Sequence, residues 1–262
     1  METDPGLSLP FVMPPIDTDA LASWFDSGFP LEFCFSSSFD ENFVDSLFAS
    51  GFIPMAAEDS ATGSDMLLPK LHTARSAFAP EEARITKSAR RDSRRYSFSF
   101  DRAFDEVLET CARVHGEDWL RPALRGCWKN LHDTRTNRRS RLVSMEIYEG
   151  DRLEAGEIGV FVGACYTSLS GFRHRSGSGT VQLAALGRFL EEVGARVWDL
   201  GMPLDYKQRL GARILGRSAF LELFRSAREG RVRLDGRATE PRDAWDLITR
   251  PCSPSPRRPE LA

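Results

Sequence analysis

The segment 157–200 constrains the fold of this chain more than any other part of it. It begins with a near-continuous apolar run at 158–166 and continues through a glycine-rich loop at 172–180. A helical stretch at 181–193 follows, and then a short strand that ends on Asp199. Because the run at 158–166 is apolar on both faces, we expect a central strand covered by helices. The predicted fold class is therefore α/β (α+β), with a mixed central sheet flanked by helices.

Changes in composition along the chain divide it into four predicted parts. Residues 1–40 are rich in Phe, Ser, Pro and Asp with little periodicity, which is typical of a loosely structured lead-in. We expect a smaller N-terminal subdomain at 41–95, with a mobile basic stretch at 80–95, and the main domain at 96–230. Pro, Arg and Ser dominate residues 231–262, which predicts a flexible, dispensable tail.

The overall composition excludes several classes of protein. A net charge of −3 over 262 residues argues against a uniformly basic nucleic-acid binder, so DNA is not an expected partner. The five cysteines form no C-x-x-C pair, which indicates reduced thiols in an intracellular compartment. No apolar run is long enough for a membrane span, and the first residues lack the features of a secretory signal. We therefore expect a cytoplasmic protein that does not bind membranes.

The loop at 173–180 is the sharpest local motif. Its glycines allow close backbone approach to a ligand, and the first N–H groups of the following helix would favour an anion. The sequence His174-Arg-Ser-Gly-Ser-Gly179 resembles the pyrophosphate loop of GNAT-type acyl-CoA N-acyltransferases, which implies coenzyme A as a ligand. An ordinary Ser/Gly-rich turn before a helix is the alternative interpretation. The candidate binding residues of this loop are His174, Gly177, Ser178, Gly179 and Thr180.

Asp199 is the candidate catalytic carboxylate. Strand ends commonly carry site residues in open sheets, and an acid in this place could position or deprotonate an attacking amine. The alternative is a solvated acid at the end of a strand, or a helix cap.

Two clusters of basic residues, within 84–95 and 135–141, are candidate phosphate contacts. The alternative is that they are solvated charged loops. The predicted RNA contacts are Arg90, Arg91, Arg94, Arg95, Arg138, Arg139 and Arg141.

Several enzyme motifs are absent from the sequence. It contains no H-E-x-x-H, no G-x-S-x-G and no G-x-x-x-x-G-K-[ST], and its four histidines lack the spacing of metal ligands. These absences disfavour zinc enzymes, P-loop enzymes and serine hydrolases of the elbow type. We expect no metal and no bound cofactor.

Several segments resemble, in the same order, the bacterial leucyl/phenylalanyl-tRNA–protein transferases. The likeness covers roughly residues 40–228. The matching pieces are F-V-D-S-L-F-A-S-G-F-I-P-M at 43–55, L-H-T-A-R-S at 71–76, the F-D…C-A…W…L-H series at 100–132, the strand at 157–166, V-W-D at 197–199 and L-G-A-R-I at 210–214.

This resemblance implies a GNAT-like catalytic domain that moves Leu or Phe from a charged tRNA to an N-terminal Arg or Lys of a protein. The implied partners are aminoacyl-tRNA and protein or peptide N-termini, without a metal. By resemblance, Asp199 takes the role of the amine-positioning carboxylate. Phe161 and Trp119 are the expected apolar contacts of the donor.

The chain also departs from the family pattern at residues of the relay and the donor pocket. The family's Gln two residues beyond the Asp is Gly201, and its G-E-S-M-F segment is replaced by S-L-S-G-F at 168–172, without the Glu. Its S-K becomes G-T at 179–180, and its motif Trp becomes Met55. We expect water or Tyr206 to complete the relay. Two alternatives stay open: an acyl-CoA-dependent N-acyltransferase, and a catalytically silent relative that binds RNA or peptides.

Overall fold

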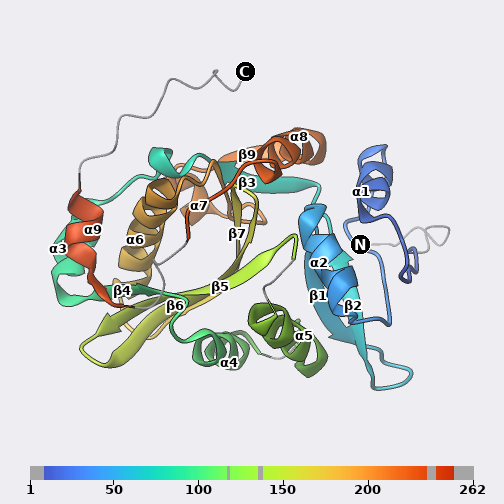
Figure 1. Ribbon diagram of the computed structural model, residues 1–262, viewed down its shortest axis with the longest axis horizontal. Coiled ribbons are helices and arrows are strands. Elements are labelled where there is room, and N and C mark those ends of the chain that lie inside the picture. The colour runs from blue at the N-terminus through green and yellow to red at the C-terminus, as the bar shows by residue number, and fades with distance from the viewer. Residues whose placement is uncertain (1–8, 117–118, 135–137, 235–239, 251–262) are drawn as a thin grey trace.

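An eight-stranded mixed sheet forms the centre of the computed structural model, which describes residues 9–116, 119–134, 138–234 and 240–250 (Figure 1). The strand order is β10-β4-β5-β6-β7-β8-β3-β9, and β7–β8 is the one parallel pair among the described strands. The strands of this sheet are β3 (Ala74–Phe78), β4 (Ser97–Phe100), β5 (Arg141–Glu149), β6 (Arg152–Val162), β7 (Cys165–Arg173), β8 (Val197–Asp199), β9 (Arg213–Gly216) and β10 (Arg242–Asp243). The predicted mixed sheet is confirmed.

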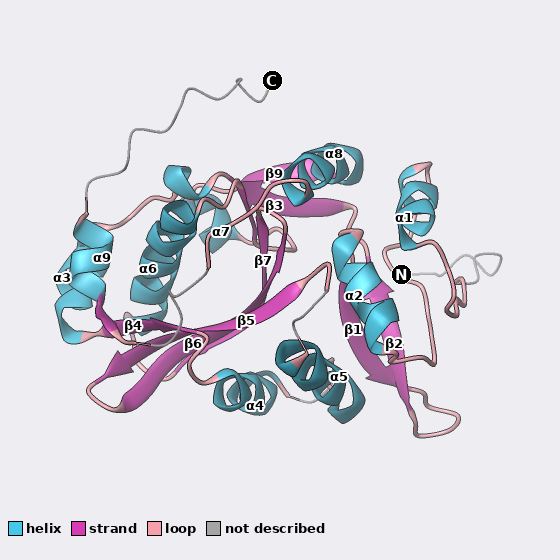
Figure 2. Ribbon diagram, in the orientation of Figure 1, coloured by secondary structure: helices cyan, strands magenta, loops and turns pink. Residues whose placement is uncertain are grey.

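Helices cover both faces of this sheet (Figure 2). On one face, α6 (Ser178–Val193) packs against β5, β6 and β7, and α9 (Ala244–Thr249) packs against α6. On the other face lie α4 (Phe104–His115), α5 (Pro122–Asp133) and α8 (Arg217–Arg228). The predicted central strand is β6, in which every residue from 154 to 162 is buried.

A smaller two-stranded sheet lies beside the main one (Figure 1). Its antiparallel strands are β1 (Ile53–Glu58) and β2 (Asp65–Lys70), and α2 (Glu41–Ala49) packs against β1. Helix α2 begins at the N-cap Asp40, whose carboxylate accepts a hydrogen bond from the backbone N–H of Phe43 at 2.9 Å.

The described part of the predicted lead-in is packed onto the rest of the protein. It contains α1 (Thr18–Asp26), and the prediction of loose structure is wrong for residues 9–40. The buried guanidinium of Arg217 donates hydrogen bonds to carbonyl oxygens in this segment and in the connection between β2 and β3. The acceptors are Phe25, Phe29 and Leu31 at 2.7–2.8 Å, and Leu71 and His72 at 3.0–3.3 Å.

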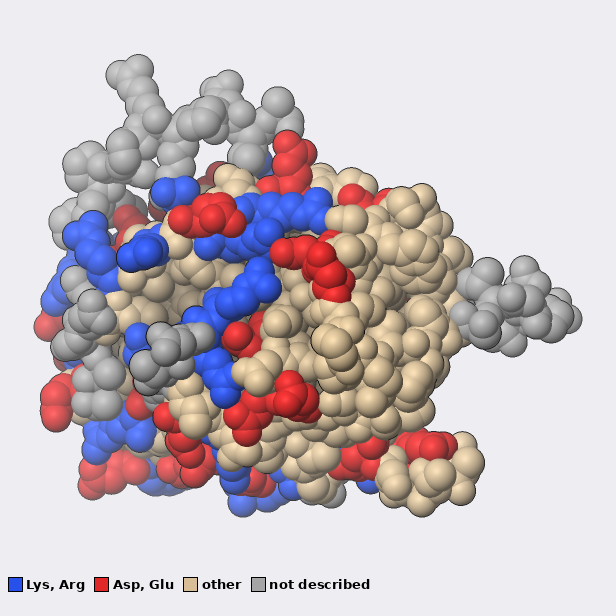
Figure 3. Space-filling view, turned by 45° about the vertical axis from the view of Figure 1, so that its right-hand side comes forward, with Lys and Arg blue, Asp and Glu red and all other residues tan. Residues whose placement is uncertain are grey.

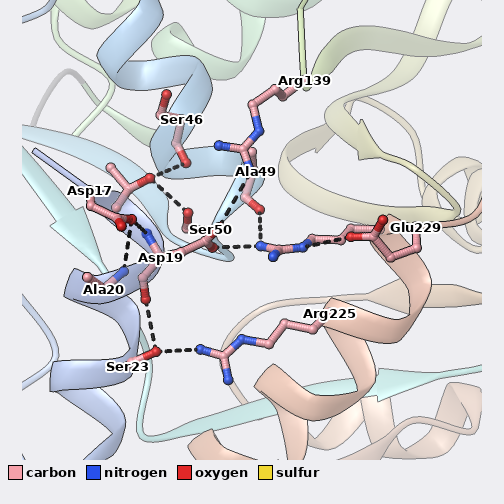
Figure 4. A network of polar contacts seen from close by, with 12 residues as sticks. Asp17, Asp19, Ala20, Ser23, Ser46, Ala49, Ser50, Arg139, Arg225 and Glu229 are labelled. Atoms are coloured by element: carbon pink, nitrogen blue, oxygen red, sulfur yellow. Dashed lines mark hydrogen bonds and ion pairs between the residues drawn. The ribbon is translucent and has the colours of Figure 1, made fainter.

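A second polar network connects α1 to α2 and α8 (Figure 4). Arg228 donates to the carboxylate of Asp19 at 2.6 Å and to the carbonyl oxygen of Ala49 at 3.1 Å. Arg225 donates to Ser23 Oγ at 2.9 Å. These arginines come from the far end of the chain, so local periodicity could not reveal that the lead-in is ordered.

Two other predicted boundaries need correction. Strand β3 lies between β8 and β9 in the main sheet, so the boundary predicted at residue 95 separates a strand from its own sheet. The basic stretch predicted to be mobile forms the 3₁₀ helices η1 (Pro80–Glu82) and η2 (Ser93–Arg95), with α3 (Lys87–Asp92) between them.

The predicted tail also contains part of the fold. Strand β10 extends the sheet beside β4, and α9 buries Ala244, Leu247 and Ile248 in the core. The tail is therefore not dispensable from residue 231. Residues 1–8 of the predicted lead-in and residues 235–239 and 251–262 of the predicted tail lie outside the described residues.

Candidate active site

The parallel strands β7 and β8 part at the centre of the sheet. Their pairing covers only residues 165–167 and 197–199, and β7 then continues to Arg173 after β8 has ended. The carboxyl ends of neighbouring parallel strands are the usual place for site residues in open sheets. Polar side chains gather on both faces of the sheet at this point.

The first polar cluster surrounds Asp199, on the face covered by α8. Its Oδ2 accepts from Arg75 Nη1 at 2.7 Å and from Thr167 Oγ1 at 3.0 Å, and its Oδ1 accepts from the backbone N–H of Gly201 at 2.9 Å. Asp199 is 0% exposed and Arg75 is 1% exposed. The predicted solvated strand-end acid is therefore wrong, because Asp199 forms a buried ion pair.

Arg75 connects this cluster to the N-terminal part of the chain. Its Nη2 donates to the carbonyl oxygen of Gly51 at 2.6 Å, and its guanidinium lies 4.3 Å from the ring centroid of Phe220 on α8. Nearby, burial and the surrounding cations lower the pKa of His72 to about 2, so this imidazole is neutral. Both residues belong to the L-H-T-A-R-S segment, which marked them without revealing that Arg75 contacts Asp199.

The second polar cluster surrounds Glu157, on the face covered by α6. Its Oε1 accepts from Tyr166 Oη at 3.0 Å and from Ser168 Oγ at 2.6 Å. Its Oε2 accepts from Gln182 Nε2 at 3.1 Å, while Trp198 Nε1 donates to Ser168 Oγ at 3.0 Å. Burial raises the pKa of Glu157 from 4.5 to about 7, and its hydrogen-bond donors only partly oppose the shift.

Glycine at position 159 permits the contact between Tyr166 and Glu157. A Cβ atom at this position would lie 2.0 Å from Tyr166 Oη, which is far inside van der Waals contact. Glu157 was not among the predicted site residues, because it directly precedes the apolar run at 158–166 and falls within the predicted strand. A carboxylate in a strand buried on both faces was the available signal.

The short helix α7 (Asp205–Leu210) completes the site after β8. The ammonium group of Lys207 donates to the carbonyl oxygens of Leu200 and Met202. Burial lowers the pKa of Lys207, and the charges of Asp199 and Glu157 oppose this shift.

Tyr206 does not form the predicted relay to Asp199. No hydrogen bond joins these two described residues, and the oxygens of Asp199 are instead bound by Arg75, Thr167 and the Gly201 N–H. Tyr206 is 46% exposed, and its pKa is raised by partial burial and by the charge of Glu157. Its position therefore favours a role near Glu157.

The predicted ligand loop opens α6, with Gly177 as the N-cap at φ +91°. Ser178 is buried, and its hydroxyl donates to the carbonyl oxygens of Glu154 and Arg175. Gly179 lies beside the side chain of Arg173, while His174 and Thr180 are exposed.

Carboxylates lie beside this loop. A Cβ atom on Gly177 would be 3.3 Å from Asp92 Oδ2, and Arg175 forms an ion pair with Glu149. These acids reduce the attraction of the loop for an anion.

The two predicted apolar donor contacts do not lie together. Phe161 is buried in β6 with its ring centroid 4.9 Å from that of Tyr166. Trp119 packs edge-on against Trp128 of α5, and its carbonyl oxygen accepts from the N–H of Ala56 in β1.

The two arginine clusters lie at opposite ends of β5. The first cluster is exposed on α3 and η2, where Arg95 pairs with Glu149 at the end of β5, Arg91 pairs with Asp92, and Arg94 lies 4.1 Å from the ring centroid of Trp245. Arg90 is also exposed. Nine residues of strand span about 30 Å, so one short RNA segment could not contact both clusters at once.

The second cluster precedes and begins β5. Arg138 donates to Glu41 and Asn42, Arg139 lies 3.6 Å from Asp19, and Arg141 lies 4.0 Å from Asp101. Arg135, at the start of the predicted cluster, lies outside the described residues.

The structure brings this cluster together with Phe161. Arg138, Arg139, Arg141 and Phe161 line a pocket of about 240 Å³. On the face shown in Figure 3, Lys and Arg side chains form a broken band with Asp and Glu side chains beside it.

Within the described ranges, no three His, Cys, Asp or Glu side chains gather as a metal site. In the same part of the chain, no helix is long and apolar enough to cross a membrane. Four cysteines there are free and buried, and burial raises the pKa values of Cys34, Cys111 and Cys127 to about 12. Cys252 lies outside the described residues.

Comparison with known proteins identifies the family. Residues 77–225 match the family model described as leucyl/phenylalanyl-tRNA protein transferase. The chain belongs to this family. The matched span contains β8, β7 and the strand that carries Glu157, while Arg75 lies just before it.

Curated relatives agree with the family model. Leucyl/phenylalanyl-tRNA–protein transferases from Shewanella loihica and Azotobacter vinelandii are 29% and 31% identical, over 62% and 56% of this chain and 68% and 65% of their own lengths. The one from Rhizorhabdus wittichii is 30% identical over 67% of this chain and 70% of its own. A solved structure from Enterococcus faecalis V583, named a probable N-acyltransferase, is 11% identical with a TM-score of 0.38 over 76% of this chain and 47% of its own.

Proposed function

We propose that this protein transfers an apolar amino acid, of the leucine or phenylalanine type, from a charged tRNA to the N-terminal amine of a protein. The observation that carries the proposal is the family match over residues 77–225, which includes both strands that part beside Asp199 and Glu157. The relatives carry this activity in their names. We also propose that the protein acts in the cytoplasm and on no DNA or membrane.

The chemistry requires a neutral amine to attack the ester carbonyl of the aminoacyl group. Polar groups that position the amine and accept its proton are sufficient, and we expect neither a metal nor a bound cofactor to take part. In this proposal Asp199 acts by position: it holds Arg75 and the turn at Gly201 in place beside the site.

The tRNA would contact the arginines at one or both ends of β5. The pocket lined by Arg138, Arg139 and Arg141 is the better candidate for the acceptor end, because three cationic side chains meet there. The exposed arginines of α3 and η2 would then contact phosphates farther along the RNA.

The acyl-CoA alternative has less support. Its pyrophosphate would have to bind the loop at 174–180, where Asp92 lies beside Gly177 and Glu149 pairs with Arg175. A silent relative that binds RNA or peptides remains the other alternative, because the family's relay Gln is Gly201 in this chain.

Two measurements on the purified full chain test the proposal. The first identifies what co-purifies with it: tRNA supports the proposal, and coenzyme A supports the alternative. The second offers leucyl-tRNA, phenylalanyl-tRNA or acetyl-CoA together with a peptide that begins with Arg. Turnover with acetyl-CoA alone would replace the proposal, and RNA binding without turnover would favour the silent relative.

A further inference from the structure

Both oxygens of Asp199 are engaged by internal donors. Arg75 and Thr167 bind Oδ2, the Gly201 N–H binds Oδ1, and the residue is 0% exposed. A carboxylate that accepts a proton from a substrate must reach it directly or through one hydroxyl or water. Among the described residues, the one hydroxyl hydrogen-bonded to Asp199 is that of Thr167, which is itself only 6% exposed, so Asp199 has no exposed route and the proton acceptor of the proposed reaction lies elsewhere.

Ser168 and Glu157 form such a route on the other face of the sheet. The indole nitrogen of Trp198 can only donate, so Ser168 Oγ accepts its hydrogen at 3.0 Å. The hydroxyl hydrogen of Ser168 is then directed toward Glu157 Oε1, 2.6 Å away. Trp198 thereby fixes the orientation of the serine and leaves the carboxylate as the acceptor.

Ser168 is also more exposed than Glu157, as the residue that meets the substrate must be. Ser168 is partly exposed and is the first residue of β7 beyond its pairing with β8, whereas Glu157 is 5% exposed. The hydroxyl is therefore the outer end of the pair and the carboxylate is the inner end.

We propose that Glu157, acting through the hydroxyl of Ser168, accepts the proton that the attacking amine releases. This inference rests on the proposed transfer reaction. Neither residue was among the predicted site residues.

The step balances in atoms and charge. The amine nitrogen forms a bond to the ester carbonyl carbon and gives one proton to Ser168 Oγ, while the Ser168 hydroxyl proton passes to Glu157. The bond between the carbonyl carbon and the ribose oxygen then breaks. The proton returns along the same route to the ribose oxygen, so the tRNA leaves as an alcohol and Glu157 is again a carboxylate.

The surroundings allow Glu157 to exchange a proton near neutral pH. Tyr166 of β7 and Gln182 of α6 donate to it, and Lys207 of α7 lowers its pKa through its charge. The charge of Glu157 also raises the pKa of Tyr206 on α7 and, across the sheet, that of Cys111 on α4. Burial outweighs these neighbours and raises the pKa of Glu157 to about 7, which suits an acceptor that must also return the proton.

The test compares wild type with Glu157→Gln and Ser168→Ala across pH 5.5–9, using leucyl-tRNA and an Arg-initiated peptide. We expect kcat/KM to fall by roughly 10²–10⁴ in both variants. In wild type kcat/KM should rise as the pH passes through about 7, where Glu157 loses its proton. This rise should disappear from the pH profile of Glu157→Gln. The α-amine of the acceptor peptide titrates near 7.7–8.0, so the rise in kcat/KM that this amine causes should persist in every variant.

Glu146→Gln is the matched control, because Glu146 is also buried in the sheet and accepts hydrogen bonds from Ser99 and Ser144. It should keep the wild-type pH profile. If Glu157→Gln does not fold, the lower rate expected of Ser168→Ala carries the test.

Two negative results are distinguishable. Active wild type with an unchanged rate in Ser168→Ala, or an unchanged acid limb in a folded Glu157→Gln, overturns the role of this pair alone. Wild type that transfers no amino acid overturns the proposed function, and the inference falls with it.

Discussion

At the scale of single residues, the buried pair Asp199–Arg75 links stability to the site. Replacing Asp199 by Asn keeps its shape but leaves the Arg75 guanidinium charged in a buried position. Breaking a buried ion pair in this way typically costs about 3–5 kcal/mol. We therefore expect Asp199→Asn to lower the free energy of unfolding by about 3 kcal/mol and to abolish transfer. Denaturant titration and the transfer assay measure the two effects.

The control for this change is the double variant Arg75→Met/Asp199→Leu, which removes both charges. Its unfolding free energy should exceed that of Asp199→Asn, because neither charge is left without its partner. If Asp199→Asn is as stable as wild type, the ion pair contributes nothing and the burial argument is wrong.

A pH dependence of stability follows from Glu157. Because burial raises its pKa from 4.5 to about 7, the native state keeps a proton that the unfolded chain has already released in this window. The free energy of unfolding therefore falls as the pH rises from 4.5 to 7, by about 3 kcal/mol from this group. Glu157→Gln should lose this fall, which denaturant titrations at pH 5 and pH 8 would detect.

The titration of His72 changes the free energy of unfolding with pH in the opposite direction, so its contribution must be separated from that of Glu157. Its pKa is lowered to about 2, so only the unfolded chain gains a proton as the pH falls below 6.5, and stability falls with it. The difference between wild type and Glu157→Gln at each pH cancels the contribution of His72. Parallel stability curves for the two proteins would contradict the raised pKa of Glu157.

The sequence indicated Asp199 as a polar centre because it ends a strand after a glycine-closed helix. It could not indicate that Arg75 lies beside it, since 124 residues separate the two and only the sheet order brings β3 against β8. Glu157 was missed for a related reason. A single acid in an apolar strand does not reveal which serine or glutamine faces it.

At the scale of elements, Arg217 of α8 holds the N-terminal segment in place. Arg217→Ala would remove the donors for five carbonyl oxygens, so we expect a loss of roughly 3 kcal/mol or more and faster hydrogen exchange in residues 9–40. Arg213→Ala is the control, because the side chain of Arg213 forms an exposed ion pair with Glu82, and its loss should change stability by less than about 1 kcal/mol. Equal exchange in both variants would show that Arg217 does not order this segment.

Periodicity predicted the long elements and missed the short ones. The apolar run at 158–166 identified β6, the central strand, because burial on both faces is visible in composition. Strand β10 has two residues and α9 has six, too few for a recognisable period, so both were included in the predicted tail. The ordered N-terminal segment depends on Arg217 and Arg228, which no local pattern includes.

At the scale of the whole molecule, we predict that RNA binding weakens steeply with salt. If about six phosphates are neutralised, log K should fall with a slope near −5 in log salt. Changing Arg90, Arg91, Arg94 and Arg95 to Ala should weaken binding and reduce this slope, and changing the same four to Lys should preserve the slope because the charge is kept. Filter binding at several salt concentrations measures the affinity and the slope. Equal slopes in the Ala variant and the wild-type protein would show that this cluster is not part of the RNA site.

The mass of the acceptor peptide is the most direct test of whether an amino acid moves from tRNA to an N-terminal amine. A peptide that begins with Arg, incubated with leucyl-tRNA and the full chain, should gain the mass of one leucine residue at its α-amine. The same peptide with an acetylated N-terminus should gain nothing, because no neutral amine is present to attack. An unchanged mass of the free peptide, with the charged tRNA intact and bound, would contradict the account.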